Sequence, residues 1–114
     1  MACVSNGIEY TKFEITRYSD YSDYISNKHA YDLYNKAARW YEIHKDDTNN
    51  FNKTEYEDNI KFIYKALMLK KKIPMANILL SLIVNHEKKP TDSTKTCKDL
   101  KEEAEKEMCK NCVV

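Results

Sequence analysis

The sequence predicts an all-α fold, a small four-helix bundle with an irregular or short-strand N-terminal arm. Apolar residues recur at helical spacing in four successive stretches. The 114-residue chain has one glycine and two prolines, so the residues that form tight turns between strands are nearly absent. A chain of this length can bury its own core. We therefore expect residues 1–114 to form a single helical domain.

The N-terminal arm is expected over residues 1–22. Its segment IEYTKFEITRY mixes β-branched and aromatic residues, as a short strand does. The sequence offers no obvious second strand to pair with it, so an arm packed on the helices is an equal alternative. The following SDYSDY supplies Ser and Asp side chains for a turn and for the N-cap of a helix.

Two amphipathic helices are expected at about 24–45 and 55–72. The first has a wide apolar and aromatic face, which suits contact with two neighbours; its stripe includes Leu33, Ala37, Trp40 and His44. The second opens with Thr54 and Glu57 at the spacing of a capping box, in which each side chain satisfies a free backbone N–H. It ends in three lysines, where positive charge suits the helix dipole.

The third and fourth helices are expected at about 74–88 and 96–111. Pro74 fits the first turn of the third helix. Between Ile78 and Val84 only Ser81 is polar, so we expect this helix to be the buried centre of the bundle. The fourth helix has a thin apolar stripe and carries Lys and Glu residues at i, i+4 spacing. It is expected to lie on the surface.

The loop between the first two helices resembles a calcium-binding loop in the spacing of its oxygen-bearing side chains. The six positions of an EF-hand that bind calcium correspond to Asp46, Thr48, Asn50, Asn52, Thr54 and Glu57. However, Phe51 stands where the loop needs glycine, and only two of the six residues are carboxylates. Thr54 and Glu57 are also assigned to the capping box. We therefore expect a polar turn, with neither a metal nor a cofactor.

The four cysteines leave three alternatives open: free thiols, disulfides or a zinc site. They are Cys3, Cys97, Cys109 and Cys112. If Cys97 and Cys109 share one helix, they stand ~18 Å apart and cannot bond to each other. A two-disulfide scheme would then pair Cys3 with Cys97 and Cys109 with Cys112. A zinc site would need all four to converge, and one C-x-x-C supplies half of the usual ligands.

Arg39 and His44 have the Arg-x4-His spacing of HEPN-type helical ribonucleases, which the chain resembles in length and helix content. The resemblance implies RNA cleavage with these two side chains at the active site. The chain departs from that pattern, because Trp40 follows the arginine where those enzymes usually have a polar residue. The motif also lies in the first long helix rather than late in the bundle. We expect a non-enzymatic protein.

Charge and hydropathy indicate the compartment and the class of partner. With 19 basic and 18 acidic residues, the chain has no net attraction for nucleic acid. No run reaches the ~18 apolar residues of a membrane span, and MACVSNGIEY lacks the pattern of a signal peptide. An intracellular location is favoured over a secreted one, unless a leader was removed.

Abundant Lys, Asn, Ile and Tyr indicate an AT-rich genome, as in many viruses, phages and parasites.

Tyrosines are concentrated in the N-terminal third of the chain. Tyr and Trp provide large contact areas at small entropic cost and are enriched in binding surfaces. We assign Tyr34 and Trp40 to the core, and predict that the others contact a partner: Tyr18, Tyr21, Tyr24, Tyr31 and Tyr41. The main hypothesis is a host- or partner-interaction module that could also form homo-oligomers. The alternative is a secreted helical protein, with every cysteine paired, that binds a small apolar ligand inside the bundle.

Overall fold

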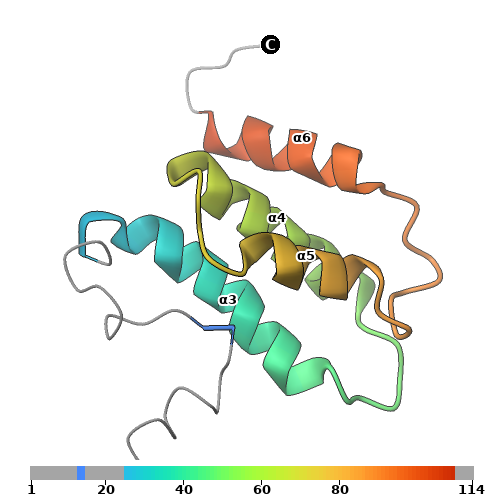
Figure 1. Ribbon diagram of the computed structural model, residues 1–114. Helices are drawn as coiled ribbons and strands as arrows, with labels where there is room; N and C mark the ends of the chain where they lie inside the picture. The colour runs from blue at the N-terminus through green and yellow to red at the C-terminus, as the bar shows by residue number, and fades with distance from the viewer. Residues whose placement is uncertain (1–12, 15–24, 110–114) are drawn as a thin grey trace, which may run out of the picture.

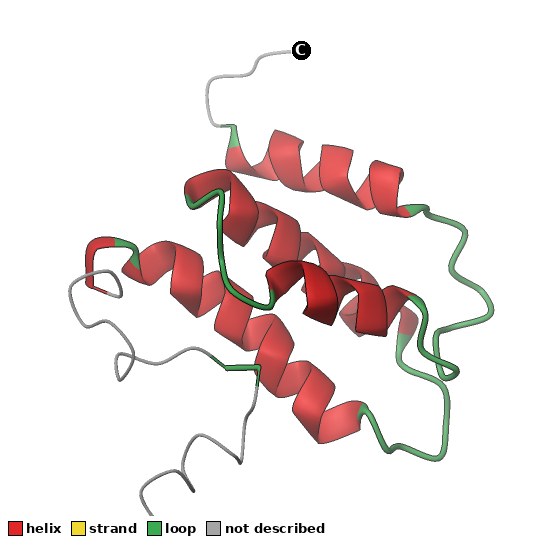
Figure 2. Ribbon diagram, viewed as in Figure 1, coloured by secondary structure: helices red, strands yellow, loops and turns green. Residues whose placement is uncertain are grey.

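The computed structural model describes residues 13–14 and 25–109, and the described residues form four α-helices and no strand (Figures 1 and 2). The helices are α3 (Lys28–His44), α4 (Lys53–Leu69), α5 (Ala76–Val84) and α6 (Cys97–Met108). The predicted all-α, four-helix fold class is therefore confirmed. Of the predicted N-terminal arm, only Phe13 and Glu14 lie within the described residues.

The central helix of the bundle is α4, which contacts α3, α5 and α6. Figure 1 shows α6 alongside α4, while the short α5 lies across α3 and α4 on another side. Ile60, Ile63 and Ala66 of α4 are completely buried. The prediction that the third helix is the buried centre is therefore wrong. An apolar composition indicates that a helix tends to be buried, but it does not show which neighbouring helices cover it.

Phe13 and Glu14 are docked on α3. The Tyr34 hydroxyl donates a hydrogen bond to the Phe13 carbonyl oxygen at 2.5 Å, and burial of this phenol raises the pKa of Tyr34. The Phe13 ring meets Tyr41 edge to face, with ring centroids 5.8 Å apart. Arg39 donates from Nε to the Glu14 carboxylate at 2.9 Å. A backbone contact, a ring contact and an ion pair thus hold this short segment in place.

The connection between α3 and α4 is anchored by Phe51. Its ring is buried, with centroids 4.8 Å from both Trp40 and His86. Its backbone N–H donates to the Lys88 carbonyl oxygen at 2.8 Å, which ties this loop to the segment that follows α5. The residue that departs from the calcium-loop pattern is therefore a core residue. Glu55 accepts a hydrogen bond from Trp40 Nε1 at 3.0 Å and closes the same cluster.

The start of α4 corrects the predicted capping box. The N-cap is Asn52, whose side chain accepts a hydrogen bond from the Glu55 N–H at 3.0 Å. Thr54 lies within the first turn, and the buried Glu57 carboxylate accepts from Ser93 Oγ at 2.9 Å instead. Asn, Asp, Ser and Thr are all good caps, so a loop containing several of them permits more than one start.

A capping box is present at the start of α6, where the sequence analysis placed none. The Thr96 hydroxyl accepts from the Asp99 N–H at 3.1 Å, and the Asp99 carboxylate accepts from the Thr96 N–H at 3.0 Å. The sequence Thr-Cys-Lys-Asp is a short-acid form of the usual motif. This reciprocal pair fixes where the chain turns into α6.

The third helix is shorter than predicted, since α5 begins at Ala76 and ends at Val84. Pro74 precedes it in a turn closed by a hydrogen bond from the Ala76 N–H to the Ile73 carbonyl at 3.1 Å. Met75 has φ 71° and ψ −5°, the values expected at the third position of a type II turn. Proline favours the second position of that turn. Pro74 therefore ends the α4–α5 connection and does not begin the helix.

Candidate functional site

The outer face of α5 is the most unusual surface of the described residues. Its sequence, ANILLSLIV, has no charged residue in nine. Ala76, Leu79 and Ile83 are fully buried, yet Ile78 is 52% exposed and Leu82 is 39% exposed. Asn77 and Ser81 are also exposed on this side, so the outer face of α5 is uncharged but not wholly apolar. An outer face without any charged residue is unusual for a surface helix.

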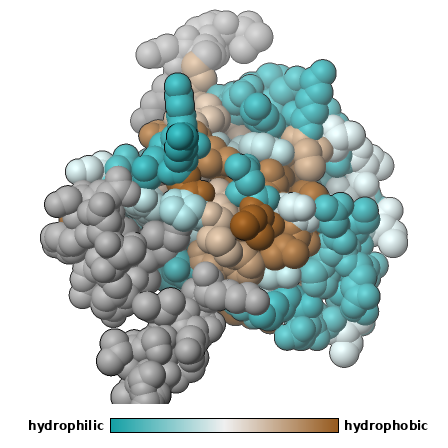
Figure 3. Space-filling view, viewed as in Figure 1, coloured by the Kyte–Doolittle hydropathy of each residue, from teal (hydrophilic) through white to brown (hydrophobic). Residues whose placement is uncertain are grey.

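The exposed apolar side chains form a row along α5. Met75, which is 39% exposed, lies three and seven residues before Ile78 and Leu82, so the three share one face. We call these three residues the α5 stripe. Figure 3 shows apolar side chains gathered in the middle of this face, over α5. A contiguous exposed apolar patch on a soluble domain marks an interaction site more often than chance.

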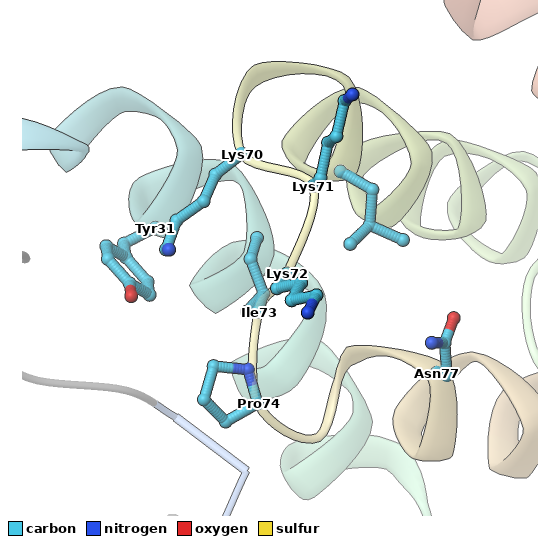
Figure 4. Close-up of a pocket in the computed structure, with 8 residues that line it drawn as sticks. Tyr31, Lys70, Lys71, Lys72, Ile73, Pro74 and Asn77 are labelled. Carbon is cyan, nitrogen blue, oxygen red and sulfur yellow. The ribbon is translucent and has the colours of Figure 1, made fainter.

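A pocket of about 420 Å³ lies at the N-terminal end of α5. It is formed by the end of α4, the α4–α5 connection, α3 and the first turn of α5 (Figure 4). Its lining combines apolar side chains with lysines and one amide: Tyr31, Leu67, Lys70, Lys71, Lys72, Ile73, Pro74 and Asn77. Pro74 directly precedes Met75, and Asn77 directly precedes Ile78. The pocket therefore lies next to the N-terminal end of the α5 stripe.

The lysines around the pocket do not converge on one point. The Lys70 ammonium lies 5.9 Å from the centroid of the Tyr31 ring, and Figure 4 shows Lys71 and Lys72 directed elsewhere. A single small anion would therefore not be held by all three. Their common effect is to surround an apolar recess with positive charge.

The two described tyrosines of the predicted binding surface are buried. Tyr31 is 4% exposed and Tyr41 is 7% exposed. The prediction that these two side chains are exposed and contact a partner is therefore corrected. The Tyr41 ring packs between Phe13 and His86, and burial raises the pKa of Tyr41. Tyr31 belongs to the core cluster and forms part of the pocket wall. The remaining predicted residues, Tyr18, Tyr21 and Tyr24, lie outside the described residues.

The cysteines bear on the three alternatives that the sequence left open. Cys97 is a free thiol, so the alternative that pairs it with Cys3 does not hold in this structure. It is the first residue of α6 and lies beside Tyr64, where burial, with a smaller contribution from Cys97, raises the pKa of Tyr64 to about 12. Cys109 is disulfide-bonded, to a residue outside the described ones. Cys3 and Cys112 also lie outside them.

The residues of the ribonuclease-like motif are engaged separately. Arg39 pairs with Glu14, whereas His44 Nδ1 lies 2.7 Å from the Asp47 carboxylate. The His44 ring also stacks obliquely on Trp40, at 5.6 Å between centroids. Both contacts are structural, one holding the arm and the other the end of α3. Among residues 13–14 and 25–109, no cluster of three or more His, Cys, Asp or Glu side chains is arranged to hold a metal ion.

Comparison of the chain with protein-family models, with curated proteins and with solved structures gave no match. In the described part of the chain, none of the helices combines the length and the apolar character needed to cross a membrane. The class of protein is therefore argued from the surface described above.

Proposed function

We propose that the chain is a non-enzymatic protein-binding module and that the α5 stripe is its docking surface. The observation that supports this most strongly is a nine-residue helix with no charged side chain and with Ile78 and Leu82 substantially exposed. An unpartnered surface helix normally carries charged residues on its outer face. A partner that covers the stripe would remove these exposed apolar side chains of α5 from water.

The size of the stripe indicates a reversible complex. Complete burial of a Leu, Ile or Met side chain contributes roughly 1.5–3 kcal/mol. Since Met75, Ile78 and Leu82 are already about half buried, covering each adds roughly 1 kcal/mol. Such a gain is modest beside the cost of association, so further contacts around the stripe must contribute. The adjacent pocket is the nearest surface that could supply them.

The tyrosine-based hypothesis is retained in reduced form. The burial of Tyr31 and Tyr41 removes them from the proposed surface, and α5 takes their place as its centre. Tyr18, Tyr21 and Tyr24 remain a proposed contribution from the N-terminal arm. The alternative of a secreted protein with every cysteine paired is not supported, because Cys97 is a free thiol.

Site-specific photo-crosslinking tests the proposal. A photoreactive amino acid is placed at Ile78, and in a matched control at Lys101, which is exposed on α6. In cells that produce the chain, we expect a discrete adduct from position 78, none from position 101, and loss of the adduct when Leu82→Lys is added. Equal adducts from both positions, or none from position 78, would exclude α5 as the docking surface.

A further inference from the structure

We infer that the partner presents an acidic amphipathic segment, with apolar side chains that cover the α5 stripe and carboxylates that meet the lysines beside it. This inference rests on the proposed function and adds the chemistry of the partner. It depends on the distribution of charge around α5 and on the pocket at its N-terminal end.

The N-terminal end of α5 is strongly positive. Lys71 and Lys72 are exposed at the edge of the pocket. The start of α5 has no side-chain cap, so the positive end of the helix dipole adds to their charge. A carboxylate near Lys71 and Lys72 would find several donors.

The other end of the stripe is close to neutral. Residues 85–89 read NHEKK, with two lysines and one glutamate. Lys88 donates from Nζ to the Thr48 carbonyl oxygen at 3.2 Å, while Glu87 and Lys89 are exposed. Since α5 has no acidic residue between these ends, the surface is an uncharged row whose positive charge is concentrated at its N-terminal end. Complementary charge at the edges of an interface steers association and fixes its orientation.

The pocket can accept an anchor side chain from the partner. Its volume, about 420 Å³, exceeds that of any one apolar side chain, and Leu67, Ile73 and Pro74 give it an apolar lining. Large side chains inserted into such recesses contribute much of the energy of protein interfaces. With the lysines around it, this pocket suits a large apolar residue that has Asp or Glu next to it.

A second copy of the chain is a poorer occupant. Parallel pairing of two α5 helices would place residues 70–72 against themselves, which opposes like charges and is unfavourable. Antiparallel pairing would place residues 70–72 against 85–89 of the other copy, which have one glutamate beside two lysines and supply no excess of carboxylates. The acidic α6 of another copy is not suitable either, because its apolar residues Leu100 and Ala104 are already buried.

Selection from a displayed library of random helix-length peptides tests the inference on the full chain. We expect the enriched peptides to combine apolar residues with an excess of Asp and Glu. The double variant Lys71→Glu with Lys72→Glu should weaken binding of an enriched peptide by about tenfold. The matched control, Lys98→Glu with Lys101→Glu, changes the net charge equally on exposed positions of α6 and should leave binding unchanged.

The outcomes separate this inference from the proposed function. Enriched peptides without an acidic excess, or equal weakening by the α6 control, would overturn the acidic partner and leave α5 as the docking surface. If Ile78→Lys with Leu82→Lys enriches the same peptides as the unmodified chain, or if no peptide is enriched at all, both proposals fail. A dimer in sedimentation equilibrium that Ile78→Lys abolishes would assign the stripe to a second copy and overturn the acidic segment.

Discussion

Met75 shows how one residue positions the docking surface. Met75 is the only non-glycine residue with a positive φ among the described residues. That conformation costs an L-residue roughly 1–2 kcal/mol, and it allows α5 to begin at Ala76, two residues after Pro74. The same turn brings Pro74 to the pocket and Met75 to the stripe. The strained residue therefore lies at the junction of the two surfaces assigned to the partner.

Replacing Met75 with glycine is expected to leave the stability of the free chain nearly unchanged. Glycine removes the cost of positive φ, but it has greater freedom in the unfolded state and loses the half-buried Met75 side chain. We expect the free energy of unfolding in urea to change by no more than about 1 kcal/mol. The matched control Met68→Gly, at an equally exposed position in α4, loses the same amount of side chain with no relief of positive φ and should lower it by about 2 kcal/mol. Losses of the same size in both variants would show that Met75 is not left-handed.

The residues at which each helix begins and ends could be predicted only in part. The loop before α4 contains several good caps, and the structure uses Asn52 rather than Thr54. The choice depends on tertiary contacts, because Glu57 is drawn towards Ser93 and the loop is fixed by the buried Phe51. Local propensity does not contain those distant partners.

Among the elements, the existence and order of the four helices follow from the spacing of apolar residues, whereas their places in the bundle do not. The pattern of α4 places Ile60, Ile63 and Ala66 on one face, and they are buried as predicted by that spacing. In α5 the polar Asn77 and Ser81 stand at i, i+4 spacing and mark the face that is exposed. The sequence analysis followed the apolar composition of the helix instead, and the candidate site was missed for this reason.

The attachment of α6 depends on charge more than that of the other helices. Its buried residues are Leu100 and Ala104, and α4 is its main neighbour. Ion pairs supplement this small apolar contact: Lys61 and Lys65 lie 2.9 and 2.6 Å from the Glu107 carboxylate, and Lys95 lies 2.8 Å from Glu103. These hydrogen-bonded lysines lower the pKa of both glutamates.

The lowered pKa values predict that α6 is less stably attached at acid pH. A carboxyl whose pKa is lower in the folded state contributes stability above its unfolded pKa and loses it as pH falls through the folded value. We expect Glu103→Gln with Glu107→Gln to unfold at lower urea than the unmodified chain at neutral pH, and the difference to disappear near pH ~3. Salt at about 1 M should shrink it at neutral pH. A difference independent of pH and salt would assign these contacts to packing.

At the scale of the molecule, the described helices form a bundle in which no other described helix covers the outer face of α5. α4 is covered by its three neighbours, the charged α6 faces outward, and the uncharged α5 is left partly exposed. The fold therefore depends little on the outer face of α5, while the proposed complex requires it. Adjacent residues of α5 should then respond to the same substitution to very different extents.

Lysine substitutions on the two faces of α5 test that statement. Ile78→Lys with Leu82→Lys places charge on half-exposed positions, where the lysine ammonium groups stay in water and part of the buried apolar area is lost, so we expect the free energy of unfolding to fall by no more than about 2 kcal/mol. Leu79→Lys, at a fully buried position, would bury an unpaired charge and should cost more than about 4 kcal/mol. Urea unfolding followed by far-UV circular dichroism measures both, and the first variant should also bind less of a hydrophobic dye. Unfolding of both variants would mean that the fold itself covers the stripe, and the surface available to a partner would have to be sought elsewhere.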